Sequence, residues 1–421
     1  MNAPAQALHD RVAAVVALSA SRLPAARHKL VEGVAHEYFA RLDAEDLAER
    51  TPEDLLGALL SHLQLGQSRQ RGKPNIRIFS PTSSEDGWWS KHSVIQIVND
   101  DMPFLVDSTS LEINRQGQTL HLIVHPILQA VRDADGQLQS LTPRNRASDA
   151  PASDAPRESW MHIEIDRLLD DAQRDALAAG VEGVLADVRA GVRDWHQMLT
   201  QLQQAIAELD HAPATLPKDV VDESRAFLQW LADDHMTLLG YRQQDLVRDA
   251  KGEVALRMVA GSGLGLLDEA GNEAVSATFS ALPSQARELA AAPLPMLVVT
   301  KSNTRSTVHR AGYTDYVGIK RYNAQGEVIG EHRFIGLFTS TAYSARVAET
   351  PLLRGKVGAI ERRAGLPPGG HLAKALDHVL ETYPRDDLFQ IPDEDLYETA
   401  LGIVALGERQ RLRLFVWRDP F

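Results

Sequence analysis

The stretch HSVIQIVNDDMPFLVDSTSLEINRQG, residues 92–117, decides the fold of this chain. It opens with a short run in which a single Gln96 stands among valines and isoleucines, and this pattern predicts a mostly buried strand. The polar cluster Asn99-Asp100-Asp101 follows and suits a turn and a helix cap. Pro103 is tolerated in the first turn of a helix, apolar residues then recur at helical spacing, and Gly117 ends the segment.

A junction between a strand and a helix exposes several backbone amides that have no partner within either element. Such a junction can bind a small anion, for example a carboxylate. It can equally be plain architecture, because the same geometry connects strands to helices in proteins of many functions. The sequence leaves both interpretations open.

Composition narrows the class of protein. The chain has 421 residues, enough for two or three domains, and its hydrophobic content of 44% and charged content of 24% are ordinary for a globular protein. A formal net charge of −13 argues against nucleic-acid and anionic-membrane partners. The absence of cysteine excludes disulfides and thiolate chemistry, and no run of about 18 apolar residues occurs. We therefore expect a cytoplasmic protein without a membrane span.

The overall expectation is an α+β chain that begins with a helical lead-in over residues 1–75. Thr51-Pro52-Glu53-Asp54 reads as a helix start with a leucine stripe behind it. Strand patterns at 93–98, 119–132 and 159–165 then surround the helix of the opening stretch. Residues 76–212 are therefore predicted to form a ferredoxin-like βαββαβ unit with helices on one face, followed by a long helix. The Ala/Ser/Asp/Pro-rich residues 144–156 read as a mobile loop.

A second mixed unit is predicted over residues 218–345. Roughly five strands with helical material inserted in the middle suggest a PAS-like sheet. Residues 346–410 are expected to be helical, and residues 411–421 begin with one isolated strand. An isolated strand suggests that the polypeptide is the front part of something longer.

Tests for catalytic chemistry yield no nucleophile–base–orienter set and no metal site. The run Gly261-Ser-Gly-Leu-Gly265 departs from the GxGxxG spacing of a dinucleotide site. His121 and His125 would lie about 13 Å apart on a strand, too far to share a metal ion. A donor-rich cluster on later strands could form a pocket for a carboxylate or phosphate, or could lie scattered on an exposed face. Its members are Lys301, Arg305, His309, Arg310 and Arg333.

Several long blocks resemble the N-terminal segment of the large bacterial NAD-dependent glutamate dehydrogenases. The blocks are NDDMPFLVDSTSLEINR, LHLIVHPI, ESWMHIEIDR, FLQWLADDHMTLLGYR, TKSNTRSTVHR and DYVGIKRYNAQGEVIGEHRFIGLFTSTAY. The resemblance implies ACT-like and PAS-type domains in this region, with RLRLFVWRDPF beginning a further ACT-like domain. It also implies a full-length enzyme that converts L-glutamate and NAD to 2-oxoglutarate, ammonia and NADH in a separate downstream catalytic domain. This chain itself would then hold no cofactor and be inactive alone.

The resemblance also implies an effector site at the loop after the first ACT strand, where the usual pattern is close to D-x-P-G-L. Phe104 stands here at the glycine position, so a large side chain occupies the place where a glycine would let a ligand approach the backbone. The candidate effector-binding residues are Asn99, Asp100, Asp101, Met102, Phe104 and Leu105.

The sequence thus favours a regulatory and oligomerisation segment of a large glutamate dehydrogenase. Its partners would be its own C-terminal catalytic domain, sister subunits of a homo-oligomer and an amino-acid effector. Two alternatives stay open: a stand-alone amino-acid sensor, and an enzyme that uses the cluster at 300–310 on a phosphorylated or carboxylated substrate.

Overall fold

The computed structural model describes residues 3–40, 42, 45–46, 49–143, 156–248, 253–268 and 284–406. The predicted strand at 411–417 and nearly all of the loop predicted at 144–156 lie outside these residues. The chain divides into two units, which are described separately. The first comprises Met1–Arg189 with Thr307–Ala311, and the second comprises Ala190–Ser306 with Gly312–Phe421.

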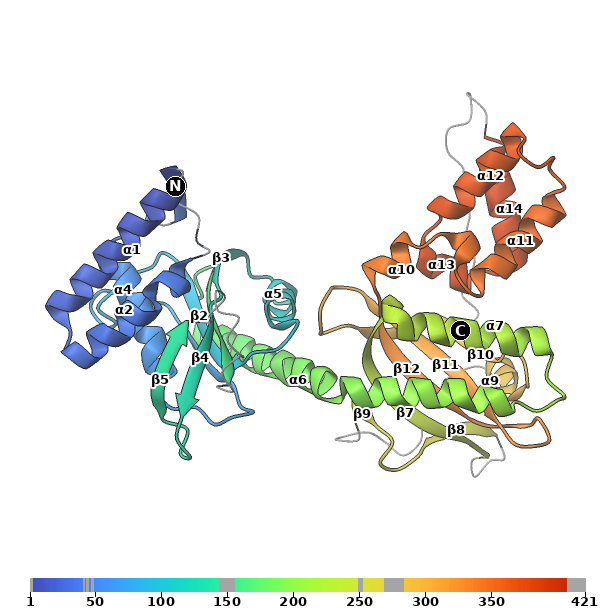
Figure 1. Ribbon diagram of the computed structural model, residues 1–421, viewed down its shortest axis with the longest axis horizontal. Helices are drawn as coiled ribbons and strands as arrows, with labels where there is room; N and C mark the ends of the chain where they lie inside the picture. Colours follow the sequence, from blue (N-terminus) through green and yellow to red (C-terminus); the bar gives the residue numbers. More distant parts are fainter. Residues whose placement is uncertain are drawn as a thin grey trace, which may run out of the picture. The chain divides into compact units, whose positions relative to one another are not determined.

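The first unit is built on a six-stranded antiparallel sheet (Figure 1). Its order is β1-β2-β6-β4-β5, and β3 also pairs with β6. The strands are β1 (Asn75–Phe79), β2 (Ser93–Asp100), β3 (Leu120–Val124), β4 (Ile127–Arg132), β5 (Leu138–Pro143) and β6 (Arg157–Ile165). The helices are α1 (Ala3–Arg22), α2 (Ala25–Phe39), α4 (Pro52–Leu65), α5 (Leu105–Arg115) and the long α6 (Asp171–Glu208).

The opening stretch forms the strand and helix that its pattern predicts, as β2 and α5. The start of α4 is also confirmed, because the side chain of Thr51 accepts a hydrogen bond from the amide of Asp54 and Pro52 stands in the first turn. Two predictions about the strands need correction. The strand expected at 119–132 is two strands, β3 and β4, which meet β6 in line and are interrupted at Pro126, a residue without an amide hydrogen. The strand beside β2 is β1, which precedes it in the chain, rather than a strand after α6.

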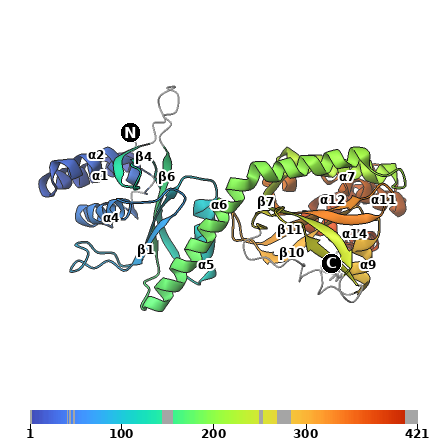
Figure 2. The same ribbon diagram turned by 90° about the horizontal axis from the view of Figure 1, so that it is seen from below.

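Helices cover both faces of this sheet rather than one (Figures 1 and 2). On one face α1, α2 and α4 pack their valines and leucines against Val98, Leu128 and Trp160. On the other face lie α5 and the first half of α6. Residues alternate along β6, so Met161, Ile163 and Ile165 share one face while Trp160, His162 and Glu164 share the other. Both faces of β2 and β6 are consequently buried.

The second unit has its own six-stranded antiparallel sheet, in the order β10-β11-β12-β7-β8 with β9 also paired to β7. Its strands are β7 (Met236–Arg248), β8 (Val254–Met258), β9 (Leu264–Gly265), β10 (Leu297–Arg305), β11 (Tyr313–Tyr322) and β12 (Val328–Phe338). The second half of α6 and α7 (Lys218–Trp230) cover one face, where Met198, Leu202 and Phe227 join a core with Tyr241 and Phe334. Shorter helical segments are η1 (Leu209–His211), η2 (Leu231–His235), α9 (Ser284–Ala291) and α10 (Ser340–Ser344).

A helical group with a separate apolar core follows the second sheet. It consists of η3 (Val347–Glu349), α11 (Leu353–Ala364), α12 (His371–Thr382), α13 (Arg385–Gln390) and α14 (Asp393–Val404). The glycine run at 261–265 ends in β9, where the amide of Gly265 donates to Asp194 at 2.9 Å. Leu266–Asp268 then form a turn. The glycine run therefore has a structural role in the sheet.

Candidate functional site

The candidate site is the junction between β2 and α5. β2 ends at Asp100, and the amide of Asp101 continues its pairing by donating to the carbonyl of Arg157 at 3.0 Å. Phe104 is the N-cap residue of α5 and has a φ of 71°, in the left-handed region. A residue with a side chain pays about 1–2 kcal/mol for this conformation, which glycine adopts without that cost. Phe104 therefore has a backbone conformation typical of glycine although it carries a phenyl ring.

The polar side chains at the end of β2 are engaged by two arginines. Asp100 accepts hydrogen bonds from Arg69 and Arg189, each at 2.7 Å, and a third from the amide of Gly72 at 3.0 Å. Asn99 accepts from Arg189 at 2.7 Å. Burial alone would raise the pKa of Asp100, but the hydrogen bonds from Arg69 and Arg189 outweigh burial and hold the pKa below its ordinary value. The carboxylate of Asp100 is therefore charged, and both of its oxygens accept hydrogen bonds from the protein itself.

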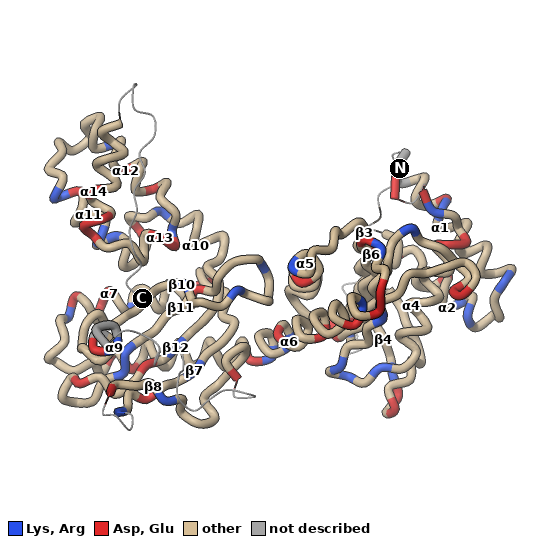
Figure 3. Tube along the Cα trace, turned by 180° about the vertical axis from the view of Figure 1, so that it is seen from behind, with Lys and Arg blue, Asp and Glu red and all other residues tan. Residues whose placement is uncertain are grey.

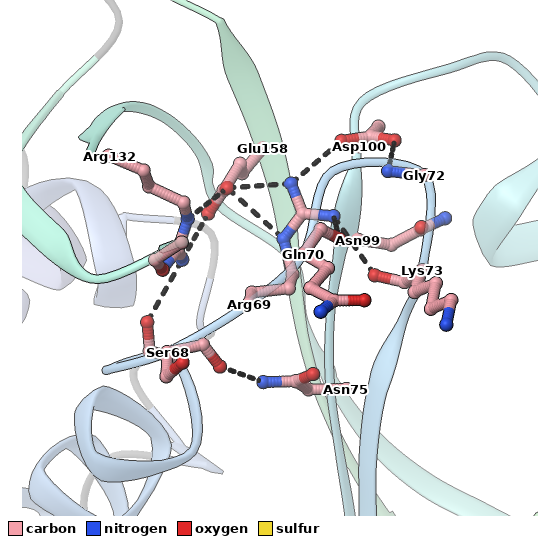
Figure 4. Close-up of polar contacts among 12 residues, drawn as sticks. Ser68, Arg69, Gln70, Gly72, Lys73, Asn75, Asn99, Asp100, Arg132 and Glu158 are labelled. Carbon is pink, nitrogen blue, oxygen red and sulfur yellow. Dashed lines mark hydrogen bonds and ion pairs between the residues drawn. The ribbon is translucent and has the colours of Figure 1, made fainter. Parts of the chain in front are cut away.

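Glu158 and Arg132 extend the network of charges around Arg69 and Asp100 (Figure 4). Glu158 accepts hydrogen bonds at 2.7 Å from both Arg69 and Arg132. The side chains of Arg69 and Glu158 are each 2% exposed. Burial would raise the pKa of Glu158, but the hydrogen bonds from Arg132 and Arg69 bring it below its ordinary value. The network ties the segment before β1 to the ends of β2 and β6, so its anion-binding capacity is directed to the protein's own carboxylates.

One donor at the junction stays unused. Asn99 is fully buried, and among the described residues its Nδ2 atom has no hydrogen-bond acceptor. An unpaired buried donor costs about 1–3 kcal/mol, so its persistence needs a reason. It marks the point of the junction at which an acceptor on a ligand would gain a hydrogen bond.

The entrance to α5 is covered by Thr307–Ala311, which belong to the first unit although they lie in sequence between β10 and β11. The amide of His309 donates to Ser108 at 3.0 Å, and the ring centroids of His309 and Phe104 are 4.8 Å apart. Thr307 donates to Asp187 at 2.7 Å. Val308 is 1% exposed. The chain itself therefore occupies the space in front of the first turn of α5.

The remaining sequence candidates have separate surroundings. Leu105 is buried, Met102 is half-buried, and Asp101 lies 3.5 Å from Arg157 in an ion pair. In the second unit, Lys301 contacts Asp315 at 2.6 Å and Asp386 at 2.8 Å. The guanidinium groups of Arg305 and Arg333 lie over the rings of Tyr313 and Tyr316, respectively. His309 and Arg310 belong to the first unit. An anion pocket that uses these five cations stays a prediction.

Sequence reasoning missed the arginines that organise the junction. Arg69 lies 31 residues before Asp100, and Arg189 lies 89 residues after it. No local spacing connects positions so far apart, so only the fold could bring them together. Charged residues are otherwise spread along both units (Figure 3). Among the residues that the structure describes, no helix is long and apolar enough to cross a membrane, and no cluster of three metal-ligating side chains occurs.

Two family profiles match parts of the chain. Residues 34–181 match "Glutamate dehydrogenase, ACT1 domain" and residues 350–409 match "Glutamate dehydrogenase, helical motif 1". An NAD-specific glutamate dehydrogenase of Halomonas elongata is 40% identical over 407 residues, which are 95% of this chain and 25% of that protein. The protein of the same name from Pseudomonas aeruginosa is 36% identical over 392 residues, 92% of this chain and 24% of its own length.

More distant similarity extends to an NAD-specific glutamate dehydrogenase of Mycobacterium tuberculosis, 25% identical over 87% of this chain and 21% of that protein. The chain thus spans about a quarter of the length of the relatives it matches. Among solved structures, an RNA-binding light-oxygen-voltage receptor aligns at 12% identity, covering 77% of this chain and 93% of the receptor chain. The TM-score of that alignment is 0.16, too low to carry an argument.

Proposed function

Because the chain belongs to the NAD-specific glutamate dehydrogenase family, as an N-terminal segment of it, we propose that it regulates and assembles such an enzyme. The complete enzyme would convert L-glutamate, NAD and water to 2-oxoglutarate, ammonia and NADH. NAD would bind in the catalytic part of that enzyme, and this chain would supply no catalytic group.

The observation that supports this proposal is the set of paired charges at the centre of the first unit. The region that matches the first ACT domain of the family contains the β2–α5 junction. There the fold gathers arginines and carboxylates that neutralise one another, such as Arg69 with Asp100 and Glu158. Carboxylates that are held in buried ion pairs by arginines position the chain. A domain whose central charged groups are paired with one another fits assembly and signalling better than chemistry.

The effector would bind at the junction, on residues 99–105. Asn99 supports this part of the proposal because its Nδ2 donor is buried without an acceptor among the described residues. An effector carboxylate could accept from that donor once Thr307–Ala311 move away from the entrance to α5. The effector would then regulate the enzyme only if it bound two states of the whole molecule with different affinities.

The second unit is proposed to be PAS-like. Its five principal strands form one antiparallel sheet, and the helix α9 lies in the insertion between the second and third of them. The proposed partners are the catalytic part of the same enzyme and sister subunits. The proposed setting is the cytoplasm, which the absence of cysteine supports.

An activity assay tests the central claim. The purified chain, incubated with L-glutamate and NAD, is expected to produce no NADH, whereas a complete NAD-specific glutamate dehydrogenase assayed alongside produces it. Robust turnover by the chain alone would show that it is a catalyst. Sedimentation equilibrium tests the assembly role: self-association is expected, and a monomer at every concentration would contradict it.

Calorimetry with a panel of amino acids tests the effector part. Binding that disappears in Asp101→Ala would support an effector site at the junction. Binding unaffected by that substitution would place the effector elsewhere in the chain. This outcome would leave the assembly role standing.

A further inference from the structure

The second sheet carries a group of charged and polar side chains on the face that turns away from α6 and α7. Tyr241 and Phe334 belong to the apolar core on the other face. Because side chains alternate along a strand, the chain neighbours of Tyr241 and Phe334 point to the opposite side of the sheet. The residues on that side, here called the polar cluster, are Arg242 and Gln244 on β7, Glu331 and Arg333 on β12, and Tyr316 and Lys320 on β11.

The register of the strands brings the members of the polar cluster together. Glu331 lies opposite Lys320 on one side and opposite Gln244 on the other. Arg333, two residues further along β12, lies opposite Arg242. The Cβ atoms of directly opposite residues are about 4.5–5.5 Å apart, and diagonal neighbours are about 7–8 Å apart. Arg333 and Gln244 are diagonal neighbours, so both side chains can reach one small ligand.

Gln244 has hydrogen-bonding groups that the described part of the protein does not use. The residue is 0% exposed, and neither its Nε2 atom nor its Oε1 atom has a partner among the described residues. Buried polar groups are nearly always paired, because an unpaired one has lost its hydrogen bonds to water without replacement. A ligand that both accepts and donates hydrogen bonds would satisfy this amide.

The donors of Arg333 are unused as well. Within the described residues its guanidinium group forms no hydrogen bond and no ion pair, and its Nε atom is buried. The guanidinium lies 5.1 Å from the ring centroid of Tyr316, and a contact with the face of a ring uses none of the N–H groups. Arginine presents five donors in a planar fork that suits oxyanions. Arg333 and Gln244 together therefore favour an anionic ligand.

The other members of the polar cluster are fixed in place by hydrogen bonds. Tyr316 donates to both carboxylate oxygens of Glu331, at 2.9 and 3.0 Å. The Nη2 atom of Arg242 donates to the carbonyl of Leu267 at 3.1 Å. Lys320 donates to a backbone carbonyl at 2.7 Å. These contacts give the two unused side chains an ordered surrounding.

The polar cluster has an excess of positive charge and is open to solvent. Arg242, Arg333 and Lys320 are its three cations, and Glu331 is its one acid. Burial raises the pKa of Glu331 by more than the cations and the hydrogen bond beside it lower that pKa. The acid therefore offsets only part of the cationic charge. Tyr316, Glu331 and Arg333 are half-buried, so a solute can approach them.

We propose that the polar cluster binds a phosphate group, either as inorganic phosphate or as a phosphate monoester. The guanidinium fork of Arg333 and the Nε2 atom of Gln244 donate to the phosphate oxygens. The Oε1 atom of Gln244 accepts from a hydroxyl group of the phosphate or of the esterified alcohol. A phosphate group carries about −1.5 to −2 charges near pH 7, which matches the excess of cations. The site goes beyond the proposed regulatory role, because binding here depends on neither assembly nor the β2–α5 junction.

Calorimetric titration of the full-length chain with inorganic phosphate and with glucose 6-phosphate, at constant ionic strength, tests the proposal. Saturable binding of at least one of them is expected, and the tighter of the two identifies the source of the phosphate group. Succinate is the control for charge, because it carries two negative charges on carboxylates. It is expected to bind at least about tenfold more weakly than the tighter phosphate compound.

Two variants of the polar cluster have matched controls on the opposite face of the same sheet. Arg333→Gln and Gln244→Met are each expected to weaken binding at least about tenfold. Arg321→Gln removes an arginine that pairs with Asp245 at 2.9 Å, and Gln243→Met removes a glutamine that lies beside Tyr241. Both controls are expected to leave binding unchanged.

Thermal unfolding separates a role in binding from a role in folding. Gln244→Met removes a buried amide without partners among the described residues, so this variant should be at least as stable as the parent when phosphate is absent. Phosphate should raise the midpoint of unfolding of the parent and leave that of Gln244→Met unchanged. If Arg333→Gln does not fold, the comparison with Gln244→Met decides.

Three results would overturn the proposal. The first is the absence of saturable binding of either phosphate compound to the folded chain. The second is binding that Gln244→Met leaves unchanged or that the two controls weaken equally, which would place the anion elsewhere. The third is succinate binding as tight as that of phosphate, which would exclude selectivity for a phosphate group. None of them bears on whether the chain self-associates or lacks turnover, so the proposed function is tested separately.

Discussion

The Nη2 atom of Arg69 lies 2.7 Å from the Oε1 atom of Glu158, and each side chain is 2% exposed. Two further partners complete the arrangement, since Arg132 contacts Glu158 and Asp100 contacts Arg69. Buried charges are costly unless every one is paired. The first unit therefore depends on a complete set of these partners, and its stability should respond sharply to the loss of one.

Glu158→Gln is expected to destabilise the protein by about 3–5 kcal/mol, because the buried Arg69 and its neighbour Arg132 lose the carboxylate that they share. Urea unfolding followed by circular dichroism measures the change. Glu53→Gln is the matched control, because Glu53 pairs with Arg22 at 3.3 Å with 48% and 56% exposure. It should cost less than about 1 kcal/mol. Equal effects of the two substitutions would show that burial of the network contributes nothing.

At position 104 the glycine variant should be more stable than the alanine variant, which reverses the usual order of the two residues. Phe104→Ala removes the ring that lies against His309 and keeps a residue with a side chain at a φ of 71°. Phe104→Gly also removes the ring but relieves the strain, by about 1–2 kcal/mol. The glycine variant should therefore have the higher midpoint of unfolding. An alanine variant of equal or greater stability would mean that α5 begins with a different backbone conformation.

Acid should destabilise the first unit through His62. Burial first, and then the nearby His162, lower the pKa of His62 from its ordinary 6.5 to about 3. Between these two pH values the unfolded chain takes up a proton that the folded chain does not. The contribution of neutral His62 to the free energy of unfolding is therefore fully present above pH 6.5. Below that value it decreases by about 1.4 kcal/mol for each unit by which the pH is lowered.

Unfolding of the protein and of His62→Gln, compared between pH 6 and pH 5, isolates this contribution. The variant should lose less stability over that interval. The pKa of Glu164 is lowered from 4.5 to about 2, so its contribution to the pH dependence lies mainly below this interval. His371→Gln, at an exposed position, is the control and should retain the pH dependence of the parent. A parent and a His62→Gln variant with identical slopes would contradict the assignment.

Two glycines should respond in opposite directions to alanine. A Cβ at Gly66 would lie 2.1 Å from the ring of Trp160, which is fully buried. The collision should cost about 1–3 kcal/mol. Gly33 lies within α2 with nothing within 4 Å of an added Cβ. Alanine there should stabilise the helix by up to about 1 kcal/mol. Thermal unfolding of both variants checks the signs, and a stabilised Gly66→Ala would refute the packing described.

Local sequence signals predicted the centre of the first unit well. The apolar run, the Asn99-Asp100-Asp101 cluster and Pro103 specify β2 and α5 through neighbours in the chain, and these elements form where expected. β1 and β5 are not predicted, because strands of five and six residues carry little pattern of their own. The pairing of β1 with β2 is non-local, and so is the covering of the second face of the sheet by helices. Periodicity alone contains neither relationship.

The candidate site likewise combines residues that local sequence signals reveal with residues that only the fold brings together. Asn99 and Asp100 are visible in the sequence as polar residues that end a strand. Their partners Arg69 and Arg189 are invisible, because nothing within one turn or one strand links them. The segment Thr307–Ala311 could not be foreseen either, since its contact with Ser108 spans 201 residues.

The position of β1 has a consequence for how the protein is made. All six strands of the first sheet are complete at Ile165, before the ribosome has added any residue of α6. A sheet that waited for a strand after α6 would leave the edge of β2 open throughout the synthesis of that helix, and open edges recruit other chains. Here the edge is closed by residues that emerged first. The edge of β2 is thus already paired while α6 is being translated, since domains fold in order from the N-terminus.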